Sequence, residues 1–161
     1  MRNIFEDLFV LELANNHWGS VDRGMRIITA FSRVARFNNV RAAIKLQFRD
    51  VLHFIHKDFL HSEERYIQKT LATAMGRDDL LALVEAVRRS SCLTMATPFD
   101  EASAEWCRDL DIVKIASSDI NDWPLIQAIA KLRKPVIVST GGSSLKDIDD
   151  LVLFFEHRNI P

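Results

Sequence analysis

The stretch that most constrains the fold runs from residue 111 to residue 142. It contains an apolar segment, DIVKIASSDI, then an amphipathic segment, NDWPLIQAIAKLRK, and then a second apolar segment, PVIVSTGG. A strand, a helix and another strand within about thirty residues are typical of a βαβ unit, in which the two strands are parallel. The sequence therefore predicts a parallel sheet whose strands alternate with helices.

The same alternation runs along the rest of the chain. Apolar runs predict strands at 8–13, 40–48, 92–96, 112–116 and 136–139. Helices are expected at 20–36, 63–75, 78–89, 101–110, 123–132 and 144–156, whereas 49–62 has no clear period and is expected to be a long loop and a candidate lid. Two α/β architectures fit: an open doubly wound sheet, or an incomplete (β/α)8 TIM-type barrel with about five of its eight units.

Composition excludes several classes of function. The chain has 161 residues, of which 48% are hydrophobic and 27% are charged, and its net charge is -1. It can bury one core, but it has no basic block for nucleic acid or an anionic membrane and no apolar run long enough to span a bilayer. The acidic N-terminal segment does not fit a signal peptide. Cys92 and Cys107 are expected to be free thiols in a reducing compartment. We therefore expect a cytoplasmic protein with no nucleic-acid or membrane partner.

Lys114 is the residue that does not fit a purely structural strand. It lies inside Ile112-Val113-Lys114-Ile115, a run apolar enough to be buried on both faces. Lysine is rarely buried without a partner. Lys114 is therefore expected to contact an anionic ligand or a carboxylate, or to have a covalent role.

Each expected strand carries polar residues toward its carboxyl end. Alternate residues of a strand share a face, so each polar residue shares its face with the residues two positions away. The resulting groups, one per strand, are Val10 and Glu12; Ala43, Lys45 and Gln47; Leu93, Met95 and Thr97; Ile112, Lys114 and Ala116; and Ile137 and Ser139. Parallel α/β folds build their sites at the carboxyl ends of strands. The set suits a small substrate with several negative charges. The alternative is a pair of buried lysine–carboxylate contacts without a chemical role.

Two other features are weaker candidates. His53, His56 and His61 lie in the expected long loop, but their spacing fits no standard metal site. The segment 140–144, TGGSS, precedes a helix and resembles a phosphate-binding turn. It lacks the lysine and the glycine spacing of known phosphate loops, so a simple turn with a helix cap fits equally well.

Five segments together resemble motifs of the N-acetylneuraminate (sialic acid) synthase family, and they occur in the family's order. ELANNHWG at 12–19 resembles E-I-G-x-N-H-x-G, AIKLQ at 43–47 resembles V-K-x-Q, TPFD at 97–100 matches T-P-F-D, KIASSD at 114–119 resembles K-I-A-S-G-[DE], and KPVIVSTGG at 134–142 resembles K-P-[VI]-I-[LV]-S-T-G. The segments cover nearly the whole chain, and they are specific only in combination.

The resemblance implies a TIM barrel that condenses phosphoenolpyruvate with N-acetylmannosamine or a related amino sugar, releasing phosphate and giving a nonulosonic acid. It implies that Glu12 and Asp119 lie on the sugar side. It further implies that phosphoenolpyruvate is held by Lys45, Thr97, Lys114, Ser117 and Ser139. We expect Glu12 and Lys114 to be catalytic, and the substrate-binding set to be Asn16, His17, Lys45, Gln47, Thr97, Ser117, Asp119 and Ser139.

The resemblance also implies parts that these residues do not supply. A divalent metal, Mn or Mg, is expected to polarise the sugar aldehyde, with ligands on later strands, and an antifreeze-like domain is expected to complete the partner's site in a homodimer. Residues 1–161 are therefore expected to be a partial barrel domain that is inactive alone. Ala14 and Ser118 replace usual glycines and Trp18 replaces a small or polar residue, which is expected to reshape the sugar pocket.

Two other functions fit the same residues. A lysine on a barrel strand also fits an aldolase that forms a Schiff base with its substrate through Lys114. The chain also fits an inactive fragment that binds a partner or has no role of its own.

Overall fold

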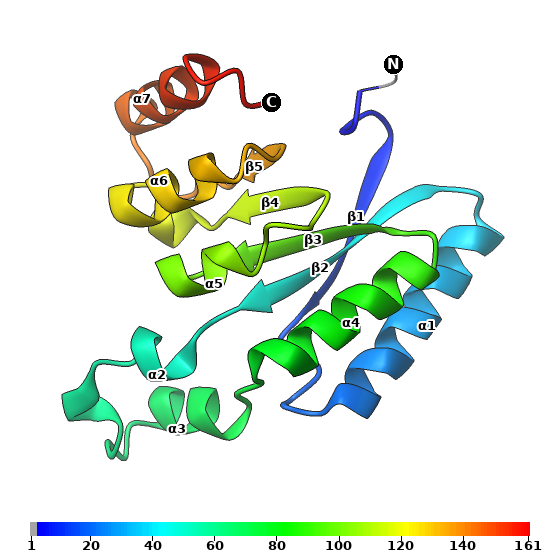
Figure 1. Cartoon of the computed structure of the whole chain (residues 1–161), viewed down its shortest axis with the longest axis horizontal. Coiled ribbons are helices and arrows are strands. Elements are labelled where there is room, and N and C mark those ends of the chain that lie inside the picture. Colours follow the sequence, from blue (N-terminus) through cyan, green and yellow to red (C-terminus); the bar gives the residue numbers. More distant parts are fainter. Residues whose placement is uncertain (1–2) are drawn as a thin grey trace.

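The computed structural model describes residues 3–161, which form a five-stranded parallel sheet with helices packed along it (Figure 1). The strands are β1 (Leu8–Ala14), β2 (Arg41–Phe48), β3 (Leu93–Pro98), β4 (Ile112–Ile115) and β5 (Val136–Val138). They lie side by side in this order, and all pairs are parallel. A doubly wound sheet reverses its strand order at a switch point, and this sheet does not. The expected incomplete barrel is therefore confirmed.

Helices connect the strands. Helix α1 (Val21–Phe37) follows β1, α4 (Arg77–Arg89) precedes β3, α5 (Glu101–Glu105) and α6 (Trp123–Lys131) flank β4, and α7 (Leu145–Glu156) follows β5. Ser20 caps α1 and accepts a hydrogen bond from the backbone N–H of Arg23, as its position before an amphipathic run predicts. No helix among the described residues has both the length and the hydropathy that a bilayer span requires.

Two sequence expectations about the connections are wrong. The segment 49–62 is not a structureless loop, because it contains α2 (Val51–Phe54) and a 3-10 turn (Lys57–Phe59), followed by α3 (Arg65–Ala72). Elements this short have too few residues to show a helical period. The helix expected to reach residue 110 ends at Glu105 instead, because the N–H groups of Trp106 and Cys107 bond three residues back and tighten the chain into turns.

Hydrophobic side chains pack on both faces of the sheet. The larger cluster lies between strands and helices and includes the fully buried Leu13, Ile44 and Leu83. A smaller cluster of Ala43, Met95 and Ile112 covers the other face, with residues of the N-terminal segment and β1 packed against it. The two clusters follow from the alternation of side chains along each strand, and the smaller one forms an apolar floor beneath the polar strand ends.

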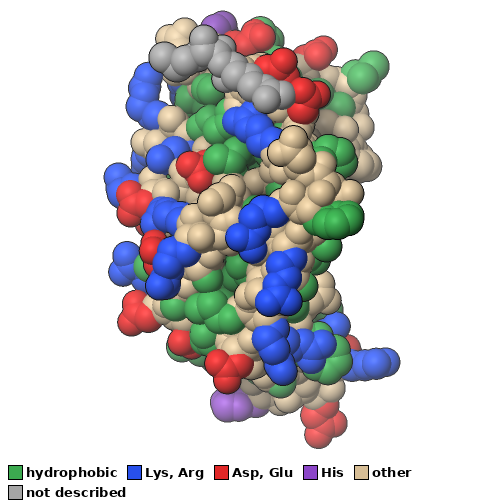
Figure 2. Space-filling model, turned by 90° about the vertical axis from the view of Figure 1, so that its right-hand side faces the viewer, with side chains coloured by type: hydrophobic (Ala, Val, Ile, Leu, Met, Phe, Trp, Pro, Cys, Tyr) green, Lys and Arg blue, Asp and Glu red, His purple; other side chains and the backbone are tan. Residues whose placement is uncertain are grey.

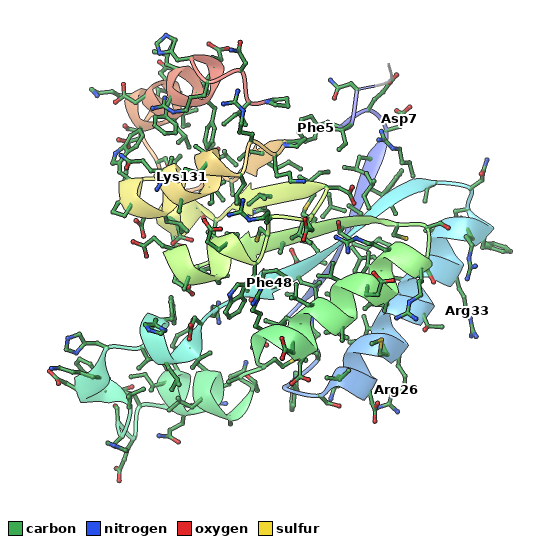
Figure 3. All side chains as sticks on the ribbon, in the orientation of Figure 1. Phe5, Asp7, Arg26, Arg33, Phe48 and Lys131 are labelled. Atoms are coloured by element: carbon green, nitrogen blue, oxygen red, sulfur yellow. The ribbon has the colours of Figure 1, made fainter. Side chains whose placement is uncertain are left out.

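Basic side chains outside the sheet lie mainly in solvent. Figure 2 shows Lys and Arg side chains gathered on the side of the molecule that carries α1. Arg26 and Arg33 are exposed on that helix and are labelled in Figure 3. They contrast with Lys45, which is 4% exposed inside the sheet.

Asp100 joins the end of β2 to the start of α5. Its Oδ1 accepts a hydrogen bond from the backbone N–H of Ser103 at 2.7 Å, and its Oδ2 accepts one from the backbone N–H of Asp50 at 2.8 Å. The next residue back, Phe99, donates its N–H to the carbonyl of Phe48 at 3.1 Å. The TPFD segment therefore fixes where the chain leaves β2.

We expect Asp100→Ala to lower the free energy of unfolding by about 2–3 kcal/mol, because α5 loses its cap and two N–H groups lose their acceptor. Urea unfolding followed by circular dichroism measures this change. Glu101→Ala, which removes the exposed carboxylate next to Asp100, is the matched control and should stay within about 0.5 kcal/mol of the parent. Equal effects of the two substitutions would contradict the assigned role.

Candidate active site at the carboxyl ends of the strands

The strand register brings the predicted polar residues onto one face of the sheet. Directly opposed pairs across neighbouring strands share a face, and the observed pairs are Val10–Ala43, Glu12–Lys45, Lys45–Met95, Gln47–Thr97, Met95–Ile112 and Lys114–Ile137. These are the faces that the alternation in the sequence predicts. The face that carries the site is therefore the one with the apolar floor.

Lys45 is the centre of the contacts on this face. Its Nζ lies 2.6 Å from Oε2 of Glu12 on β1 and 3.3 Å from Oγ1 of Thr97 on β3. Lys45 and Thr97 are buried, whereas the side chain of Glu12 is 49% exposed. A buried ammonium needs a close counter-charge and hydrogen-bond acceptors, and this one finds both. Three neighbouring strands are thus joined through one lysine.

Lys114 lies in a different electrostatic environment. Its Nζ approaches the carbonyl oxygen of Ile115 at 3.4 Å, and it forms no ion pair with any residue in the range 3–161. Burial, followed by repulsion from Lys45, lowers the pKa of Lys114, and attraction by Glu12 and Asp119 only partly opposes this. The alternative of two buried lysine–carboxylate contacts therefore holds for Lys45 but not for Lys114, which is a cationic position without a close counter-ion.

Asp119 ends the 3-10 turn Ser117–Asp119 that follows β4. Its Oδ2 is buried and has no hydrogen-bond partner among the described residues. Burial raises the pKa of Asp119, with a smaller contribution from Asp122, while a hydrogen bond with Ser118 acts in the opposite direction. Asp119 therefore has one carboxylate oxygen, Oδ2, without a donor, and its raised pKa means that it holds a proton more readily than an exposed aspartate.

The ends of β4 and β5 lie side by side. The backbone N–H of Ser139 donates to the carbonyl of Ile115 at 3.1 Å, which extends the pairing beyond β5. A methyl group at Gly141 would lie 3.7 Å from Oγ of Ser117. Ser117 follows β4 by one residue and Ser139 follows β5 directly. Both residues are partly exposed, and they lie at the carboxyl ends of these two strands.

The side chains of Asn16 and His17 form hydrogen bonds within the turn that follows β1. Asn16 Nδ2 donates to the carbonyl of Leu13 at 2.9 Å, and His17 Nδ1 accepts the N–H of Gly19 at 3.0 Å. Burial lowers the pKa of His17, in keeping with a neutral ring whose Nδ1 is an acceptor. His17 and Gln47 line a pocket of about 30 Å³, which is enough for about one water molecule. Within residues 3–161, no hydrogen bond or ion pair joins Asn16, His17 or Gln47 to Lys45 or Glu12.

The weaker candidates have other partners. His53 Nδ1 lies 2.8 Å from Asp50, and His56 lies 3.5 Å from Asp58. Within residues 3–161, no group of three or more His, Cys, Asp or Glu side chains is placed to hold a metal ion. The TGGSS turn ends in Ser144, which caps α7 in a capping box with Asp147, so the simpler of its two interpretations accounts for its contacts.

Arg49 was not among the residues predicted for the site. It follows β2 directly, and its guanidinium carbon lies 4.2 Å from the ring centroid of Phe99 and 5.3 Å from that of Phe54. Arg49 lies just beyond β2, which ends at Phe48, so the alternation of Lys45 and Gln47 does not predict its side. It was missed because residue 49 was assigned to a loop, where alternation carries no information.

These features define a class of protein: a parallel barrel-type α/β protein with charged and hydroxyl side chains gathered at the carboxyl ends of its strands. The chain belongs to the NeuB family, whose model matches residues 38–160. The similarity of its motifs to those of the sialic acid synthases is thereby confirmed.

Three relatives illustrate the relationship. A protein described as spore coat polysaccharide biosynthesis protein E, from Chromobacterium violaceum, is 34% identical, with a TM-score of 0.91 over 96% of this chain and 47% of that one. An N-acetylneuraminic acid synthetase from Leptospira borgpetersenii, solved with citrate, is 26% identical, with a TM-score of 0.77 over 96% of this chain and 51% of that one. The pseudaminic acid synthase of Campylobacter jejuni is 25% identical over 99% of this chain and 48% of its own length. The chain thus spans about half of each.

The electrostatics of Lys114 give a prediction that does not depend on activity. Glu12 is one of the two carboxylates that raise the pKa of Lys114, so Glu12→Gln should lower that pKa further. The measurement is the pH titration of labelled methyl groups on reductively methylated lysines, with Lys114→Arg to assign the resonance. Glu101→Gln removes an exposed carboxylate that is not among the charges acting on Lys114, and it should leave the titration unchanged. An unchanged or higher pKa in Glu12→Gln would contradict the described electrostatics.

Proposed function

We propose that this chain is part of a synthase that condenses phosphoenolpyruvate with N-acetylmannosamine or a related N-acetylated amino sugar. The product is a nonulosonic acid, and phosphate is released. The observation that carries the proposal is Lys114, a partly buried cation without a close counter-ion at the carboxyl ends of the strands. In a member of the NeuB family, such a position suits a substrate that brings its own negative charge.

On this proposal, phosphoenolpyruvate binds between the two lysines. Lys114 supplies the cation for an oxyanion of the substrate, and Lys45 supplies a second one that Glu12 already partly neutralises. Hydroxyl donors on neighbouring strands, from Thr97, Ser117 and Ser139, complete the anion site, since ammonium and hydroxyl groups both donate to phosphate and carboxylate oxygens. The motif similarity assigns the same residues to this substrate.

The two carboxylates are proposed to face the sugar. Glu12 is about half exposed, so it can accept hydrogen bonds from sugar hydroxyls while it holds Lys45. Asp119, whose pKa is raised by burial, is suited to hold or release a proton close to the reacting groups. Asn16, His17 and Gln47 are proposed to form the substrate-binding wall beside them.

The family resemblance also implies a divalent metal, Mn or Mg, that polarises the aldehyde, and a homodimer. The residues at 3–161 do not provide a cluster of ligands for that metal, so the roles above are assigned to this chain's side chains alone. The metal, the dimer and the antifreeze-like domain remain predictions from the resemblance.

Lys114→Met is expected to weaken phosphoenolpyruvate binding by about 2–5 kcal/mol, because the anion loses a charged partner in a partly buried site. Calorimetric titration of the chain with phosphoenolpyruvate measures the dissociation constant. Glu12→Gln is the matched variant, and it should weaken the amino sugar more than phosphoenolpyruvate. If Lys114→Met binds phosphoenolpyruvate as tightly as the parent, the proposed function is wrong.

A Schiff-base aldolase remains a second candidate, because the lowered pKa of Lys114 favours the neutral, nucleophilic amine. Treatment with borohydride in the presence of pyruvate separates the two functions. A synthase should give no adduct, whereas reduction of an imine would add a covalent pyruvate-derived mass to Lys114. Peptide mass spectrometry, with Lys114→Arg as the control, identifies the modified residue. An adduct on Lys114 would favour the aldolase.

A further inference from the structure

A third cation stands at the same end of the sheet as the two lysines. Arg49 is the first residue after β2, and it lines the same small pocket as Gln47 and His17. The backbone on each side of Arg49 is held by the turn that follows β3. The N–H of Phe99 donates to the carbonyl oxygen of Phe48, and the N–H of Asp50 donates to the carboxylate of Asp100. The position from which the Arg49 side chain leaves is therefore fixed.

Aromatic rings orient the guanidinium. Phe99 and Phe54 lie 4.2 Å and 5.3 Å from its central carbon, and the two rings pack edge to face with centroids 6.3 Å apart. A stacked ring attracts the cation but accepts no ordinary hydrogen bond. The five N–H donors of an arginine lie in its own plane, so they must find acceptors at the edge of the group.

One of these donors has no acceptor within the described part of the chain. Nε of Arg49 is buried and has no hydrogen-bond partner among residues 3–161. Asp50, the adjacent carboxylate, pairs with His53 at 2.8 Å. Asp119 attracts Arg49 electrostatically, but no ion pair within 4.0 Å joins them. Arg49 is thus an oriented cation with a free donor.

We propose that Arg49 binds an oxyanion, a carboxylate or a phosphate, of a ligand at the mouth of the candidate site. An arginine offers a planar fork that matches two oxygens of such a group, which a lysine cannot do. The inference rests on the proposed function for its choice of ligands. The oxyanion belongs either to phosphoenolpyruvate or to a phosphorylated form of the amino sugar.

Calorimetry on the full chain tests this with four probes: inorganic phosphate, phosphoenolpyruvate, N-acetylmannosamine 6-phosphate and neutral N-acetylmannosamine. Arg49→Gln should weaken at least one anionic probe about tenfold or more and leave the neutral sugar unchanged. Arg49→Lys, which keeps the charge but not the fork, should restore only part of the affinity. Arg33→Gln removes an exposed charge on α1 and should change none of the four.

The pattern of losses identifies the source of the oxyanion. A loss confined to phosphoenolpyruvate assigns Arg49 to that substrate, and a loss confined to the sugar phosphate assigns it to the acceptor. Unchanged binding of every anion, or equal weakening of the neutral sugar, overturns the inference. If phosphoenolpyruvate does not bind while inorganic phosphate still depends on Arg49, the proposed function fails and the oxyanion site stands. Thermal unfolding of Arg49→Gln and Arg49→Lys checks that both variants fold.

Discussion

The ammonium of Lys45 is the constraint on which the arrangement of this sheet depends. A lysine that is 4% exposed must be compensated within the protein, because desolvating a charge costs several kcal/mol. Glu12 and Thr97 provide that compensation from the two neighbouring strands. A shift of one residue in either pairing would turn these partners to the helix-covered face. The ion pair therefore disfavours alternative registers of β1, β2 and β3 as well as holding the charge.

Below this charge the inner face is apolar, and the boundary between the two layers is sharp. Ala43, Met95 and Ile112 are fully buried directly beneath the polar strand ends. An apolar floor lowers the local dielectric, so charges above it act more strongly on one another than they would in water. The lowered pKa of Lys114 reflects this arrangement, because both burial and the neighbouring Lys45 contribute to it. Packing and electrostatics at the site thus have a common origin in the alternation of two side-chain types.

That alternation is also why much of the fold was predictable from sequence. Strand positions, their parallel order and the side on which Glu12, Lys45 and Lys114 lie all follow from period two and the repeated strand–helix pattern. What alternation cannot give is the partner of a given side chain. Lys45 and Lys114 look equivalent in sequence, yet only Lys45 has a carboxylate at contact distance, because β1 supplies Glu12 beside β2 and no described carboxylate lies as close to Lys114. Helices as short as α2 (Val51–Phe54) likewise have too few residues to show a periodic signal.

The TPFD segment at the end of β3 shows how a motif can support a site through residues that hold the backbone of a neighbouring segment. Asp100 reaches back to the N–H of Asp50 and caps α5 at the same time, and Phe99 both bonds the end of β2 and stacks on Arg49. TPFD therefore serves the site in two ways: Thr97 contacts Lys45 directly, while the last two residues fix the direction in which Arg49 leaves the sheet. Replacing either of those two would leave the two lysines in place but remove the support of the third cation. The residues of the turn after β3 therefore determine where a charged side chain of the neighbouring strand connection, Arg49, is placed.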